Sequence, residues 1–176
     1  MSTNLDVVIQ RISAFKVAAL TAQAPFAELG DEVRRQWQRV QQNVPENHSG
    51  RLDIDTGYVL TPQWTGVEEN GNTAVKVGVK VSSWNEVPDR LEHIEVPEGD
   101  YAVTRFQGDR KRLNTIYDDL FSWLDRNGYE RNTKKGVYWI ESNRLKPVNP
   151  FDIPSVEIQK FDYDIAIAIV QKDKEW

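Results

Sequence analysis

The segment Tyr138-Trp139-Ile140-Glu141 combines residue types whose spacing could do chemistry. In an extended strand successive side chains point to opposite faces, so Trp139 and Glu141 share one face. A carboxylate beside aromatic rings is poorly hydrated, and its charged form is costly unless a donor or a cation compensates it. An organic cation would pair with Glu141 and gain about 0.5–2 kcal/mol from each well-placed ring. If Ile140 faces a helix, the pattern predicts that Glu141 faces an open hollow.

The alternative is that Glu141 emerges at the end of its strand and pairs with Arg144 or Lys146 in solvent. A hollow is nevertheless favoured by the last predicted strand, in which isoleucines alternate with Ala166 and Ala168. The isoleucine face would pack against a helix, and the other face would offer only methyl groups. Gly78 stands at the matching place in the first half, so two nearly bare strand faces could leave room for a small ligand. Close packing of the two halves is the competing explanation.

Five further aromatic residues could line this hollow or close its edges. Tyr101 and Phe106 fall on opposite faces of one predicted strand, so only one of them can point inward. With Glu141, Trp139, Gly78, Ala166 and Ala168, the candidate ligand-binding residues are Tyr58, Trp64, Trp84, Tyr101 and Phe106. Trp37 and Leu120 lie on helix stripes and are predicted to be core residues instead.

Two helices and several strands must position these side chains. Apolar residues at spacings of three and four predict one helix from Phe26 to Val40 and another from Leu113 to Leu124. Alternating patterns predict strands, most clearly over residues 75–81 and 165–170. The two helix stripes match at an offset of 87 and the two strand patterns at an offset near 90, which indicates an internal duplication. We therefore expect an α+β fold of tandem strand-helix-strand-strand modules, with antiparallel sheets around a pseudo-two-fold ligand cleft.

Composition restricts the functional classes. The 176 residues, 39% of them hydrophobic, suit a single domain over 1–176, with approximate halves 6–90 and 91–172. A net charge of −5 with interspersed signs argues against a nucleic-acid partner. The absence of cysteine excludes disulfides and thiolate chemistry, and neither His48 nor His93 has the neighbours of a metal site, so no metal or cofactor is expected. No run is long enough to span a membrane, and we expect a cytoplasmic protein.

The stretch from Leu91 to Gly108, with Val77-Gly78-Val79-Lys80-Val81 before it and Asn127-Gly128-Tyr129 after the second helix, closely resembles the middle of GyrI-like effector-binding domains. The resemblance implies tandem modules around a ligand cleft, binding of amphipathic and often cationic small molecules, and an acid on the strand after the second helix, which Glu141 matches. Asn143 departs from the pattern, because a tyrosine commonly follows the acid by two residues. Many relatives carry an N-terminal helix-turn-helix for transcription control, and we expect this chain to be a stand-alone effector-binding protein.

Three functions remain open. The first is binding of aromatic or cationic small molecules. The second is hydrolysis with Glu141 as general acid or base, because some GyrI-like proteins are hydrolases of strained small molecules. The third is inhibition of a protein partner, because the family takes its name from a gyrase inhibitor, although no feature of the sequence specifically points to such a partner. No esterase, dinucleotide or nucleotide motif is present.

Overall fold

The computed structural model describes residues 5–64 and 72–172. Within these ranges the chain has the predicted α+β architecture, with two α-helices and one antiparallel sheet of nine strands. The helices are α1 (Phe26–Asn43) and α2 (Arg110–Arg126), and two short 3-10 turns are η1 (Pro150–Asp152) and η2 (Ser155–Glu157). The strands are β1 (Val8–Ile12), β2 (Phe15–Ala24), β3 (Thr56–Pro62), β4 (Thr73–Val81), β5 (Glu92–Val96), β6 (Gly99–Gly108), β7 (Tyr129–Arg131), β8 (Tyr138–Arg144) and β9 (Phe161–Gln171).

Local sequence explains where α2 begins and ends. The Asp109 side chain caps its N-terminus by accepting a hydrogen bond of 2.9 Å from the backbone N–H of Arg112. At the other end the helix stops before Gly128, whose φ of +81° is easily adopted only without a side chain. Neither helix in the described ranges is both long enough and apolar enough to cross a membrane.

The strands run in the order β1-β6-β9-β8-β3-β4-β2-β5, and β7 pairs with the end of β9. Pairing of β3 with β8 joins the predicted antiparallel sheets of the two halves into one sheet. The sheet also closes on itself. The β1–β6 register, Ile12 opposite Gly99, continues without a shift into the β2–β5 register, Phe15 opposite Val96. β1 and β2 thus act as one bent strand that pairs along its length with a second bent strand, β5 and β6. This pairing closes the sheet into a ring, which gives the sheet an inner face.

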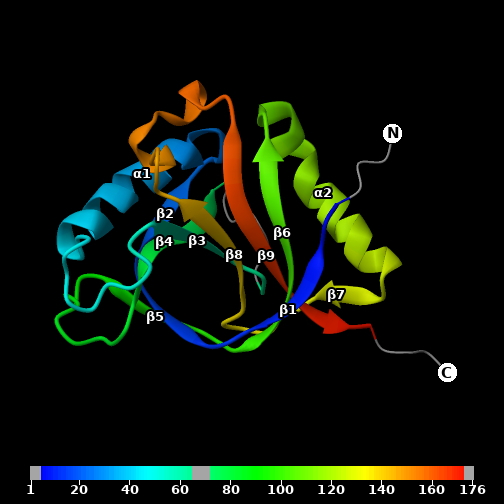
Figure 1. Ribbon diagram of the computed structural model, residues 1–176, viewed down its shortest axis with the longest axis horizontal. Coiled ribbons are helices and arrows are strands. Elements are labelled where there is room, and N and C mark those ends of the chain that lie inside the picture. The colour runs from blue at the N-terminus through cyan, green and yellow to red at the C-terminus, as the bar shows by residue number, and fades with distance from the viewer. Residues whose placement is uncertain (1–4, 65–71, 173–176) are drawn as a thin grey trace.

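Both helices pack on the outer face of this ring, and Figure 1 shows α1 and α2 flanking the strands. Val59 of β3 and Glu141 of β8 lie opposite each other in the β3–β8 ladder, so they share this helix-covered face. Val59 belongs to the core under α1, whereas Ile165, opposite Glu141 on the other side, belongs to the core under α2. A third core, described below, fills the inner face.

The element order repeats as predicted. In both halves the helix begins 11 residues after the start of the preceding strand, from Phe15 to Phe26 and from Gly99 to Arg110. The strands that follow each helix also correspond, β3 with β8 and β4 with β9. The ends of the β3–β8 ladder match as well. Gln63 donates its backbone N–H to the Val137 carbonyl at one end, and at the other end residue 145 donates to the carbonyl of residue 55.

These equivalences place matching residues of the two helices 84 positions apart in the sequence, not 87 as predicted. Val33 then corresponds to Tyr117, and Trp37 corresponds to Phe121. The prediction was one turn out of register because spacings of three and four fit a helix equally well after such a shift. It also counted Phe26 as part of the buried stripe, although this side chain is 75% exposed.

Candidate functional site

The helix-covered face of the second half holds a carboxylate among three aromatic side chains. Glu141 and Trp139 come from β8, Tyr163 from β9 and Tyr117 from α2. The strand residues face the helix because each lies an even number of positions from a neighbour in the core under α2. Tyr117 reaches them because it lies three residues before the buried Leu120, on the same side of α2. We call these four residues the Glu141 cluster.

Hydrogen bonds and ring contacts hold the cluster together. Tyr117 donates its hydroxyl to the Glu141 carboxylate, and the hydroxyl oxygens of Tyr117 and Tyr163 lie 3.0 Å apart. Trp139 stacks on Tyr117 with ring centroids 5.4 Å apart, and the tilted ring of Phe121 lies 6.4 Å from that of Trp139. A carboxylate with hydroxyl partners and aromatic walls can bind a cation or act as a proton donor or acceptor.

The electrostatics of the cluster are those of a carboxylate partly removed from water. Burial raises the pKa of Glu141, and the hydrogen bonds from Tyr117 and Tyr163 oppose this shift only in part. The same burial and the nearby carboxylate raise the pKa of both tyrosines, so they remain neutral donors. Among the described residues no Lys or Arg forms an ion pair with Glu141. The charged form of this carboxylate therefore lacks a cationic partner within that part of the chain.

The indole of Trp139 is also incompletely satisfied. Its Nε1 atom is buried and makes no hydrogen bond of ordinary geometry with any described residue. It still lies near enough to the Glu141 carboxylate to favour the charged form, and this opposes the effect of burial on the pKa of Glu141. A buried donor without a partner normally costs free energy, and such groups are rare in native proteins. The cluster therefore has an unused donor beside an unneutralised carboxylate.

The predicted orientation of β8 was wrong. We expected Ile140 to face a helix and Glu141 to face a hollow between the halves, but Ile140 and Tyr138 pack into the inner core and Glu141 faces α2. The predicted alternative also fails, because Arg144 pairs with Asp162 and Asp164 and Lys146 pairs with Glu46. The physical reason lies on α2, where the Tyr117 hydroxyl offers the carboxylate a donor.

Most of the other predicted residues lie on the inner face, where their own side chains form a core. Tyr101 is 1% exposed there and Tyr58 stands beside Phe15 at 5.6 Å. Gly78 is close-packed, because a Cβ atom at this position would lie 2.3 Å from the Ala18 carbonyl oxygen. The predicted inner-face residues in this core are Tyr58, Trp64, Tyr101, Ala166 and Ala168. Their part in ligand binding stays a prediction.

Two predicted residues lie elsewhere. Phe106 packs in the core under α2, with its ring centroid 5.4 Å from that of Tyr163, and so lies on the opposite face from Tyr101 as predicted. Trp84 packs at the edge of the core under α1 and stacks on His93 at 4.6 Å. Of the candidate set, the structure thus brings only Trp139 and Glu141 into the Glu141 cluster.

Sequence reasoning missed Tyr117 and Tyr163 as partners of the acid. Tyr163 lies two residues before Ile165 in the same strand and therefore shares its face. This spacing was a usable signal. The signal for Tyr117 required knowing which face of β8 meets α2.

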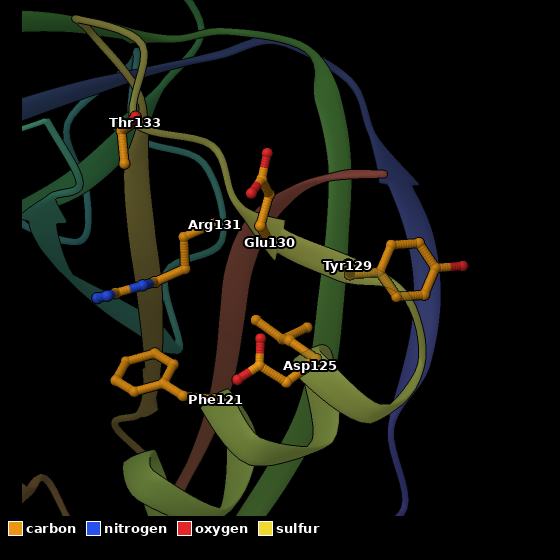
Figure 2. A pocket seen from close by; sticks show the side chains of 7 residues that line it. Phe121, Asp125, Tyr129, Glu130, Arg131 and Thr133 are labelled. Carbon is orange, nitrogen blue, oxygen red and sulfur yellow. The ribbon is translucent and has the colours of Figure 1, made fainter. Parts of the chain in front are cut away.

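A cavity of about 270 Å³ opens at the C-terminal end of α2, next to the cluster. Figure 2 shows Phe121 and Asp125 of α2 on one side and Glu130 and Arg131 of β7 on the other. Phe121 belongs to both places, since it lines the cavity and contacts Trp139. The cavity and the Glu141 cluster are therefore separated by aromatic rings.

Comparisons with known proteins agree with this architecture. A family model described as "GyrI-like small molecule binding domain" matches residues 5–159. No curated protein matches the chain in sequence. A structure of SAV2435 bound to tetraphenylphosphonium is similar, with a TM-score of 0.61 and 11% identity over 94% of each chain. The EcmrR C-terminal domain gives a TM-score of 0.69 and 15% identity over 96% of this chain and 99% of that one.

A cryo-EM structure of an EcmrR–DNA complex gives a TM-score of 0.68 and 14% identity, over 96% of this chain and 58% of that one. At identities this low, the likeness to these solved structures shows a shared fold.

Proposed function

Since the chain belongs to the GyrI-like small molecule binding domain family, we propose that it binds aromatic, lipophilic organic cations and that Glu141 is the anionic partner. The observation that carries this proposal is the partly buried Glu141 carboxylate, which has aromatic rings around it and no cationic partner among the described residues. A permanent cation would neutralise it without having to lose a proton. The tetraphenylphosphonium bound to SAV2435, a protein of similar fold, is such a cation.

The geometry favours a lipophilic cation over a hydrated one. A ligand that reaches Glu141 must lie against Trp139 and Tyr117, and it would leave water to do so. Large aromatic cations lose little hydration energy, and they gain both ring contacts and charge pairing. The unused Nε1 donor of Trp139 could remain beside the carboxylate in the complex.

The test is a titration of tryptophan fluorescence with tetraphenylphosphonium chloride and with neutral triphenylphosphine oxide. We expect Glu141→Gln to weaken binding of the cation by about tenfold or more, because a charge-assisted partner is lost. Binding of the neutral compound should change little. Glu95→Gln is the matched control, because Glu95 is an exposed carboxylate on β5. Flat titrations of the wild-type protein, or equal loss in both variants, would contradict the proposal.

A second candidate function is hydrolysis of strained electrophilic rings. It is favoured by the raised pKa of Glu141, which keeps a carboxylic acid protonated nearer to neutral pH, and by the adjacent hydroxyls of Tyr117 and Tyr163. In that case Glu141→Gln should abolish turnover of an epoxide or similar substrate and leave binding of a neutral ligand intact. Turnover that survives in this variant would exclude Glu141 as the acid.

A further inference from the structure

Each half of the molecule places an arginine over an aromatic ring of its helix. The guanidinium carbon of Arg51 lies 5.9 Å from the ring centroid of Trp37, and that of Arg131 lies 4.4 Å from the ring of Phe121. The positions correspond between the halves. Trp37 and Phe121 are equivalent on their helices, Arg51 bridges to residue 81 at the end of β4, and Arg131 pairs with residue 169 near the end of β9.

The two arginines differ in how firmly they are held. Arg51 is 6% exposed and donates to the side-chain oxygen of Gln41 at 2.8 Å and to the carbonyls of Val44 and Ile54 at 3.2 and 3.4 Å. Arg131 is exposed, and its side chain makes no hydrogen bond or ion pair with any other residue in the described ranges. Its one specific contact there is with the ring of Phe121, as Figure 2 shows.

The contact of Arg131 lies at the outer end of a continuous row of rings. Phe121 tilts against Trp139, Trp139 stacks on Tyr117, and Tyr117 donates to the carboxylate of residue 141. The row therefore has a partly buried carboxylate at one end and an exposed cation at the other. The cavity beside Phe121 gives solvent access to the exposed end.

We propose that Arg131 is a displaceable internal cation that a ligand must remove from Phe121 before it can occupy the aromatic row. This inference rests on the proposed function and adds a selectivity element to it. A small hydrated cation gains no more from Phe121 than the guanidinium does, and it also meets the repulsion of Arg131. A lipophilic cation with several rings covers more of the row and displaces the guanidinium into water. Arg131 thus selects for large aromatic cations.

The charge and the stacking of Arg131 can be tested together. Arg131→Gln should bind tetraphenylphosphonium about two- to fivefold more tightly than wild type, the range that one exposed cation–π contact represents. Arg126→Gln is the matched control, because it removes the same charge from the exposed last turn of α2. Tetramethylammonium should gain relatively more from Arg131→Gln than tetraphenylphosphonium does. An affinity of Arg131→Gln equal to or below that of Arg126→Gln would overturn the inference.

Displacement itself can be followed by NMR of the arginine Nε–H groups. In the free protein the ring of Phe121 should shift the Arg131 signal, and saturation with tetraphenylphosphonium should return it to the position of a solvated arginine. The Arg51 signal should stay unchanged and serves as the internal control. Binding with the Arg131 signal unmoved would overturn the displacement and leave the proposed function intact. Flat titrations in wild type and both variants would contradict the proposed function and the displacement together.

Discussion

The two halves of the sheet use one backbone frame for two different interiors. On the helix-covered face of the first half, Val33, Val59 and Val75 form part of an apolar core. By the equivalences of the helices and strands, the matching residues of the second half are Tyr117, Glu141 and Tyr163. The first half shows that the frame packs well with aliphatic side chains at these positions. The polar cluster is therefore not required to build the fold, and this favours a functional reason for it.

The fourth member of the cluster shows the same contrast. Trp139 corresponds to Gly57, and the space above Gly57 is occupied by Trp37 and Phe151, which stack with centroids 4.6 Å apart. In the first half the aromatic rings thus come from the helix and from η1, and they fill the interior. In the second half an aromatic ring comes from the strand and stands beside the acid.

The largest effect is expected when the first half receives the acid of the second. Val59→Glu would bury a carboxylate in an apolar core where valines stand in place of the two tyrosines, and it should cost about 3–5 kcal/mol of unfolding free energy. Urea denaturation would measure this loss. The reciprocal Glu141→Val is the control, and we expect it to stay within about 1.5 kcal/mol of wild type or to stabilise the protein. Similar losses in both variants would end the argument that only the second half accommodates the acid.

A smaller effect is expected from adding a methyl group at Gly57, against the rings of Trp37 and Phe151. A Cβ atom there would lie 2.7 Å from the ring of Phe151 and 2.9 Å from that of Trp37, so Gly57→Ala should destabilise the protein by about 1–3 kcal/mol. Gly99→Ala is the control, because the nearest atom to a Cβ at that position is 3.9 Å away. Thermal unfolding of the two variants would compare them. If Gly57→Ala were neutral, the interior of the first half would be looser than the structure indicates.

The smallest effect is the pH dependence that Glu141 adds. Its pKa is raised in the folded protein above the ordinary value of 4.5, so the folded state binds more protons than the unfolded chain in the interval between them. The stability of wild type relative to Glu141→Val should therefore be greatest below about pH 4.5 and should fall as pH rises through the raised pKa. One proton limits the slope to about 1.4 kcal/mol per pH unit. Denaturation curves at several pH values would measure it, and a relative stability that increases with pH would have the wrong sign.

The sequence predicted the elements and their repetition because apolar spacing reports helix and strand locally. It predicted that Trp139 and Glu141 share a face, since alternation along one strand needs no tertiary information. It could not decide which face. That choice depends on Tyr117, which lies 24 residues away and meets Glu141 only after α2 has packed. The space expected beside Gly78 is filled for a related reason. Small residues such as Gly78 were taken to leave space, but a neighbouring strand approaches closely and uses it.

The closed ring has a consequence for how the protein folds. β1 belongs to the first half of the chain but pairs with β6 of the second, and β5 belongs to the second half but pairs with β2 of the first. Each repeat thus lends a strand to the other, as in a domain-swapped dimer whose subunits have been fused. A chain cut near residue 90 should give two fragments that are unfolded alone and regain structure when mixed. The intact protein should lose both repeats in one cooperative step.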